Sequence, residues 1–255
     1  MGFLSYHSNG LMLSMLLGQI LSFGLLFFQT IKEDKIYIRH LSFSTIKNSF
    51  KVHQDFPKYN MPQGFLDGFR ESSIVLIISN YFGPVVLGSY SFAMNIINKP
   101  FLLIGNSFQQ VFFQKINIYK DNKKKIMDIT KSSIIGLTLI SLPPLLIGVF
   151  FIKEIFNFIF SDKWHQAGIL SQLLILWIVL RFIVSSISSI PFVLNRLKTN
   201  FFYSFFYNVF PPLVLLLSAK YIDSYYSSFI LFTISNLNVI AFTFYWYLKI
   251  CKEEA

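Results

Sequence analysis

The chain has 255 residues, of which 54% are hydrophobic, 18% aromatic and only 13% charged, and its mean hydropathy is +0.55. A soluble domain carries about 25% charged residues, so this chain lacks the polar surface of a water-soluble globule, and a soluble enzyme is excluded. The formal net charge of +10 is explained more simply by membrane topology than by nucleic-acid binding.

The apolar residues occur in runs of about 20, the length of a helix that crosses the bilayer core. A transmembrane β-barrel would need short segments of alternating hydrophobicity instead. The sequence therefore predicts an all-α polytopic membrane protein with seven transmembrane helices. We place these spans at residues 11–31, 60–81, 88–112, 132–152, 168–194, 201–219 and 226–248.

The Lys and Arg residues between these spans predict the orientation. Sixteen of them fall on one set of alternate connections, including 32–59 and 113–131, and three fall on the other set. Because cytoplasmic loops carry the excess of Lys and Arg, we expect the N-terminus outside and the C-terminus in the cytoplasm.

The spacing of the spans suggests a two-part organisation. One span, within residues 1–31, is followed by a basic cytoplasmic linker at 32–59, a compact group of six spans at 60–248 and a cytoplasmic tail at 249–255. This order resembles the last span of a first lobe followed by an entire second lobe. We therefore expect the chain to be a fragment, or a mis-started reading frame, of a longer protein.

No pattern in the sequence indicates catalysis or a cofactor. A single cysteine, Cys251, excludes a disulfide framework and a cysteine-rich metal site. The four histidines do not cluster, and there is no catalytic triad, phosphate-binding glycine loop or metal-ligand spacing. We expect no enzyme activity, no cofactor, no metal and no nucleic-acid partner.

Three basic residues lie inside predicted spans: Arg70, Lys99 and Arg181. Each is roughly ten to fourteen residues from a span end, about 15–20 Å at the helical rise, which is near the bilayer midplane. A basic residue at that depth costs about 2.5–3.5 kcal/mol on insertion scales. Three cations at one depth on three spans suggest a shared interior cavity.

Other polar residues accompany these cations. Asp67 and Glu71 share a helix face with Arg70. On the next span, one helical stripe consists of Asn95, Lys99, Asn106 and Gln110, which Asn98 and Gln109 flank. Two interpretations remain open: a hydrophilic cavity for an anionic or polar substrate, or a structural cluster in which the two acids neutralise the cations. The amides alone are better explained by helix–helix contacts than by contact with a substrate.

The connection at 153–168 is aromatic and amphipathic. Phe156, Phe160 and Trp164 recur at a spacing of four. We expect this segment to lie along the outer membrane interface with Trp164 as an anchor.

Several short motifs occur in a recognisable order. An FPxYxxP entry begins at Phe56, an FGxxxxGxY connection includes Phe82, Gly83, Gly88 and Tyr90, and an AxxIxxxP run comprises Ala93, Ile96 and Pro100, followed by FQQVFF. Later, IFSDKWHQAG (159–168) is similar to an FGxxWxxAG segment in which Ser161–Asp162 replaces the glycine. Together these motifs resemble the polysaccharide-exporter, or Wzx-type, O-antigen flippases of the multidrug/oligosaccharidyl-lipid/polysaccharide exporter superfamily.

That resemblance implies a transport function and a two-lobed, twelve-span fold, of which this chain would supply the sixth to twelfth spans. Such proteins move undecaprenyl-diphosphate-linked oligosaccharides, for lipopolysaccharide and other surface polysaccharides, from the inner to the outer leaflet through a cavity lined by basic residues. The positions available here are Arg70, Lys99 and Arg181, with Asn95, Asn106 and Gln110 beside them. Asp67 or Glu71 would be candidates for ion coupling. The implied partners are a lipid-linked oligosaccharide, membrane lipid, and a missing N-terminal lobe or a second copy.

Three alternatives remain. A multidrug exporter of the same superfamily would need an acidic or aromatic cavity for cationic drugs. A membrane enzyme such as an O-antigen polymerase would carry a large outer loop, whereas the longest outer connection here has about 15 residues. A non-transporting structural membrane subunit would tolerate the loss of the three intramembrane cations.

Overall fold

The computed structural model describes residues 7–33, 42–52 and 54–253, and the regular structure in these ranges is helical. The chain divides into two units, Met1–Gln54 and Asp55–Ala255. The first unit contains α1 (His7–Glu33) and α2 (Phe43–Val52). Within α1, Leu13–Lys32 is long and apolar enough to cross a membrane.

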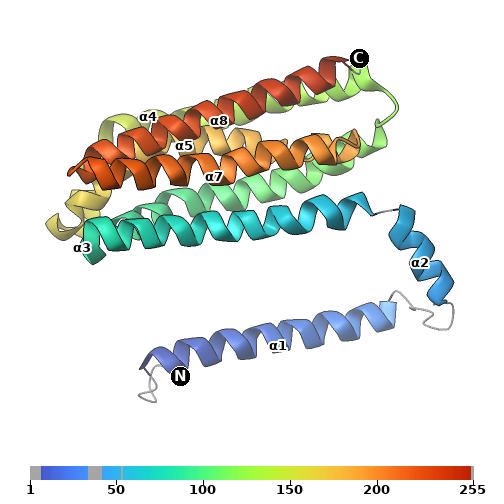
Figure 1. The fold of residues 1–255 in the computed structure, drawn as a ribbon, viewed down its shortest axis with the longest axis horizontal. Coiled ribbons are helices and arrows are strands. Elements are labelled where there is room, and N and C mark those ends of the chain that lie inside the picture. The colour runs from blue at the N-terminus through green and yellow to red at the C-terminus, as the bar shows by residue number, and fades with distance from the viewer. Residues whose placement is uncertain (1–6, 34–41, 53, 254–255) are drawn as a thin grey trace. The chain divides into compact units, whose positions relative to one another are not determined.

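The second unit is a bundle of long helices (Figure 1). Its elements are α3 (Asp55–Ile118), α4 (Lys123–Phe160), the 3₁₀ turn η3 (Asp162–Trp164), α5 (His165–Ser186), α6 (Ile190–Val193), α7 (Leu197–Tyr221) and α8 (Tyr225–Glu253). The central helix is α5, which packs against α3, α4 and α8. Of the apolar window that contains α5, 61% is buried, against 17% for α4, so α5 forms the core and α4 presents most of its surface outward.

The longest helix, α3, is folded back on itself at Gly83. Gly83 has φ 82° and ψ 174°, which are not helical, and divides α3 into two arms. Figure 1 shows the arms running in opposite directions through the bundle. In the described residues, six helices are long and apolar enough to cross a membrane, and α3 alone contains the second and third predicted spans.

The fourth predicted span does not end at residue 152, and the position of the segment at 153–168 along a membrane interface stays a prediction. Helix α4 continues unbroken to Phe160, because its aromatic side chains pack inward on the second arm of α3. The ring of Phe92 lies 5.9 Å from that of Phe156, 5.0 Å from that of Phe160 and 3.9 Å from that of Trp164. These contacts fix the corner at which the chain leaves α4 and enters α5.

The turn after α4 holds a residue in a glycine conformation. Ser161 has φ 68° and ψ 169°, a region that only glycine adopts without strain. This is the position at which the similar motif has glycine. The motif therefore reflects a backbone requirement that this chain meets with a serine, at a cost in stability.

We predict that Gly83→Ala lowers the stability of the bundle by about 1–3 kcal/mol, because alanine is strained at this φ and ψ. A Cβ on Gly83 would meet nothing within 4 Å, so any loss of stability would come from the backbone conformation and not from a side-chain clash. The matched control is Gly88→Ala, since a Cβ there also meets nothing within 4 Å but the backbone is helical. Thermal unfolding of the two variants in detergent checks this, and equal midpoints would contradict it.

We predict the opposite result at the other strained turn. Ser161→Gly should stabilise the protein by about 1–2 kcal/mol by relieving the positive φ. Ser161→Ala removes the same hydroxyl without relieving the backbone and should give no gain. The thermal midpoints of both variants provide the measurement, and a gain in Ser161→Ala alone would show that the hydroxyl, not the backbone, is responsible.

Candidate functional site

Arg70 is the most deeply buried of the three intramembrane cations, with 4% of its surface exposed. Its Nη2 donates a hydrogen bond of 2.7 Å to Asn236 Oδ1 on α8. Its guanidinium lies 4.5 Å from the ring centroid of Tyr207 on α7 and 5.5 Å from that of Trp177 on α5. One side chain of α3 therefore contacts three other helices, by a charge-assisted hydrogen bond and two cation–π contacts.

A hydrogen bond within α8 orients the side chain of Asn236 for this contact. Its Nδ2 donates a 2.8 Å hydrogen bond to the carbonyl oxygen of Phe232, one turn earlier. This bond directs the amide oxygen away from the helix backbone and toward Arg70. Asn236 is completely buried, so the amide takes the place that water would have at a guanidinium.

Asp67 lies one turn before Arg70 on α3 and binds a different amide. Its Oδ1 accepts a 2.7 Å hydrogen bond from Asn208 Nδ2 on α7, and the same Nδ2 lies 3.3 Å from Ser204 Oγ. Among the residues that the structure describes, no ion pair joins Asp67 or Glu71 to any of the three cations. An ion cluster that neutralises the cations would require such pairs.

Arg181 is half-buried on α5, and its guanidinium lies 5.8 Å from the ring of Trp177. Trp177 thus lies beside both arginines, since the Arg70 guanidinium is 5.5 Å from the same ring. Arg181 also lines two larger cavities and a small pocket of about 10 Å³ that shares residues with both of them. Its position between them makes it the centre of the candidate site.

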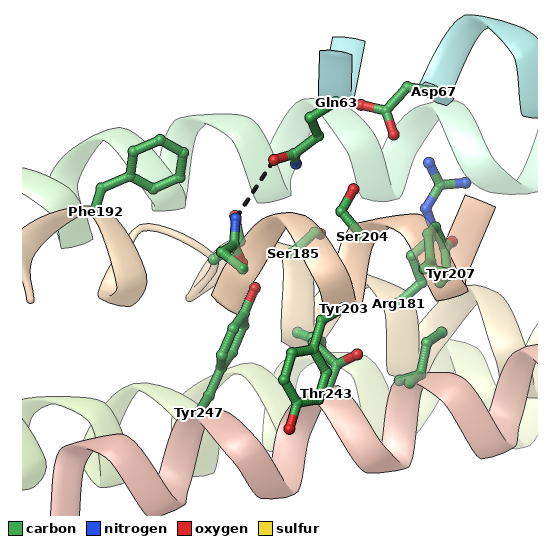
Figure 2. Close-up of a pocket in the computed structure, with 14 residues that line it drawn as sticks. Gln63, Asp67, Arg181, Ser185, Phe192, Tyr203, Ser204, Tyr207, Thr243 and Tyr247 are labelled. Carbon is green, nitrogen blue, oxygen red and sulfur yellow. Dashed lines mark hydrogen bonds between the residues drawn. The ribbon is translucent and has the colours of Figure 1, made fainter. Parts of the chain in front are cut away.

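The first cavity, which we call the α7 cavity, has a volume of about 210 Å³. It is lined by Gln63, Asp67, Arg181, Val184, Ser185, Ser188, Phe192, Asn200, Tyr203, Ser204, Tyr207, Ile240, Thr243 and Tyr247. Figure 2 shows Asp67, Tyr207 and Arg181 at one end of the cavity, and Phe192 and Tyr247 at the other. Across it, Asn200 Nδ2 donates a 3.4 Å hydrogen bond to Gln63 Oε1, which joins the beginning of α7 to the beginning of α3.

The second cavity, the α3 cavity, lies between the two arms of α3 and α5 and has a volume of about 410 Å³. It is lined by Arg70, Glu71, Ile74, Val75, Tyr90, Ser91, Met94, Asn95, Asn98, Lys99, Leu102, Trp177 and Arg181. Three cations and one carboxylate face this space. Its lining therefore favours an anion.

The structure distributes the predicted site residues unequally. The α3 cavity brings together Arg70, Glu71, Asn95, Lys99 and Arg181, and the α7 cavity contains Asp67 and Arg181. Asn106 and Gln110 are exposed and line neither cavity. Their neighbour Gln109 instead donates a 2.8 Å hydrogen bond from Nε2 to Ser188 Oγ, which ties the second arm of α3 to the segment after α5.

Sequence reasoning missed the partners of the charged residues. Asn208 and Asn236 are amides inside predicted spans, and that signal was available from their positions. Trp177, Tyr207 and Tyr203 carry no such signal, because aromatic residues are abundant in every span. Only the packing of α5, α7 and α8 identifies these aromatic side chains as part of the site.

The chain matches a known protein family over most of its first two thirds. A family model described as a polysaccharide biosynthesis protein matches residues 2–168, well over half of the chain. The matched range contains Arg70 and Lys99, and it ends at Gly168 before Arg181. No curated protein and no solved structure matches the chain.

We predict that Asn236→Leu destabilises the bundle by about 2 kcal/mol, because it removes the amide that accepts from the buried Arg70 cation. Asn238→Leu is the matched control. Asn238 lies on the same helix and makes the same kind of backbone bond, 2.9 Å to the carbonyl of Ile234, but it is exposed. Thermal midpoints in detergent compare the two, and equal midpoints would show that the Arg70 contact contributes nothing.

Proposed function

The chain belongs to the polysaccharide biosynthesis protein family of Wzx-like exporters, and from that premise we propose that it transports a lipid-linked oligosaccharide across a bacterial plasma membrane. The cargo we propose is an undecaprenyl-diphosphate oligosaccharide that moves from the inner to the outer leaflet. The family is one of transporters, and we propose no catalytic step for this chain.

The observation that supports this proposal is the position of Arg181 between two cavities. The α3 cavity extends from Arg181 toward the turn at Gly83, since Tyr90 and Ile74 line it. The α7 cavity extends the opposite way, toward the start of α7, since Asn200 and Gln63 line it. A diphosphate that passes from one cavity to the other therefore keeps the same guanidinium as a partner, and Arg is the side chain best suited to bind phosphate oxygens in pairs.

The charge of the site favours an anionic cargo over a cationic one. Arg70, Lys99 and Arg181 line the α3 cavity with a single carboxylate, Glu71. No ion pair among the described residues neutralises these cations. A multidrug exporter of cationic compounds would require the opposite balance, so this alternative ranks second.

The exposed polar residues of α3 support the participation of a second lobe. Asp67, Glu71, Asn95 and Lys99 are exposed on α3 near the middle of its arms. Polar side chains at that depth are costly in contact with lipid. We propose that this face of α3 looks into a water-filled space closed by another lobe, either a preceding part of the same protein or a second copy.

The remaining assignments are part of the same proposal. With the orientation that the Lys and Arg distribution predicts, the N-terminus is outside and the C-terminus cytoplasmic, so the α7 cavity opens toward the cytoplasm. Asp67 is the better candidate for ion coupling, because it binds Asn208 inside the α7 cavity. Glu71 faces the α3 cavity beside the phosphate-binding cations.

We predict that Arg181→Gln abolishes transport, because it removes the charge common to both cavities. Arg181→Lys should retain part of the activity, since it keeps the charge but loses the bidentate geometry. The measurement is the surface polysaccharide of cells that depend on the variant, with its membrane level verified by immunoblotting. The matched control is Lys163→Gln, at an exposed lysine that lines neither cavity.

Three outcomes separate the alternatives. Normal surface polysaccharide in Arg181→Gln would overturn the site assignment. A change in drug sensitivity with unchanged polysaccharide would support the multidrug exporter. No phenotype in a triple variant of Arg70, Lys99 and Arg181 that still co-purifies with a partner would indicate a structural subunit.

A further inference from the structure

A third cavity lies between the end of α3 and the beginning of α4, away from the site around Arg181. Its volume is about 510 Å³, and Lys115, Tyr119, Lys124 and Lys125 are among its lining residues. We call it the lysine pocket. Figure 1 shows the connection from α3 to α4 at the same end of the bundle as the C-terminus.

The lysine pocket has an excess of positive charge. Three lysines face it, and the one carboxylate in its lining is Asp128. No ion pair among the described residues joins Asp128 to these lysines. Lys125 Nζ lies 4.1 Å from the ring centroid of Tyr119, so an aromatic face holds this ammonium group at the pocket instead of a carboxylate.

The loop that forms the pocket is ordered by its own hydrogen bonds. Asn122 Oδ1 accepts a 3.1 Å bond from the backbone N–H of Lys125 and caps α4. This cap fixes the direction in which α4 leaves the turn. The two lysines at 124 and 125 are thereby presented from one short segment opposite Lys115.

Apolar side chains on both helices continue from the lysine pocket toward the middle of the membrane. Ile135 and Leu139 on α4 are 60% and 64% exposed, and Val111 on α3 is 65% exposed. Between the lysines and these apolar residues along α4, Ser132 and Ser133 complete the polar lining of the pocket. A ligand with a phosphate at one end and hydrocarbon at the other would match this change from polar to apolar surface.

We propose that the lysine pocket binds the headgroup of an anionic phospholipid, with its acyl chains along the exposed faces of α3 and α4. A basic pocket between transmembrane helices at the membrane surface is suited to a lipid phosphate. The hydroxyls of Ser132 and Ser133 supply donors for the remaining headgroup oxygens. This site shares no residue with the two cavities that Arg181 lines, and it does not depend on the transport proposal.

Lipid binding to the purified full chain tests this proposal. The probes are phosphatidylglycerol and phosphatidylcholine, added at equal concentration in detergent, and native mass spectrometry measures the fraction of protein that retains each lipid. We expect the wild-type chain to prefer phosphatidylglycerol. In the variant with Lys115→Gln, Lys124→Gln and Lys125→Gln, binding of phosphatidylglycerol should weaken by at least about tenfold.

The control variant removes the same amount of charge from lysines outside the pocket. Lys120→Gln, Lys131→Gln and Lys198→Gln change three exposed lysines that do not line the pocket, and this variant should keep the wild-type preference. A second test variant, Ser132→Phe, fills the pocket without changing the charge and should also lose the preference.

Three results would overturn the proposal. An equal loss in the pocket and control variants would show that diffuse surface charge, not the pocket, attracts the lipid. Displacement of phosphatidylglycerol by millimolar inorganic phosphate would show a site for free phosphate that makes no use of the apolar faces. Retained preference in Ser132→Phe together with loss in the lysine variant would likewise contradict a headgroup seated in the cavity.

Discussion

The contact of Arg70 with Asn236, Tyr207 and Trp177 is the interaction on which the site depends. Removing a guanidinium from water is costly unless hydrogen bonds and polarizable faces replace its hydration. Here an amide 2.7 Å away and two aromatic rings provide that replacement. Because these partners come from α5, α7 and α8, the charge can be buried only when the four helices are correctly assembled. The same contact therefore links the fold to the charge of the site.

The choice of neutral partners for Arg70 has an electrostatic consequence. A carboxylate at 4 Å would interact with a guanidinium by about 4 kcal/mol at an effective dielectric constant of 20, and it would cancel most of the field felt by a ligand. The amide of Asn236 and the two aromatic rings stabilise the cation but carry no net charge, so the positive charge of Arg70 is not cancelled. Asp67 is engaged by Asn208 instead. The α3 cavity is therefore positive because the acids nearest to Arg70 in sequence are not its partners in the fold.

Much of this fold is predictable from the sequence, since hydropathy and length alone place every long helix and the connection at Gly83. The extent of α4 is not, because Phe156 and Phe160 look like interfacial residues until Phe92 is known to pack against them. In the sequence the strain at Ser161 is visible only as a departure from a motif, and its physical meaning becomes clear only from the positive φ of this residue in the structure. The partners of Arg70 and Asp67 are separated from them by more than one hundred positions in the chain, and no local periodicity reports contacts of that kind.

The three intramembrane cations look equivalent in sequence, yet burial separates their roles. Arg70 is 4% exposed and already has a hydrogen-bonded partner, so its charge acts on a ligand mainly through the field that it sets up in the α3 cavity. Lys99 is exposed and Arg181 half-buried, and both retain donors that a phosphate can reach. The fixed cation makes the cavity attractive to an anion, whereas the two accessible cations would be able to exchange partners if the anion moved as we propose. A site that must release its ligand needs accessible cations such as Lys99 and Arg181. Water can hydrate an accessible cation when the ligand leaves, whereas a fully buried cation would then have no replacement for the ligand's negative charge.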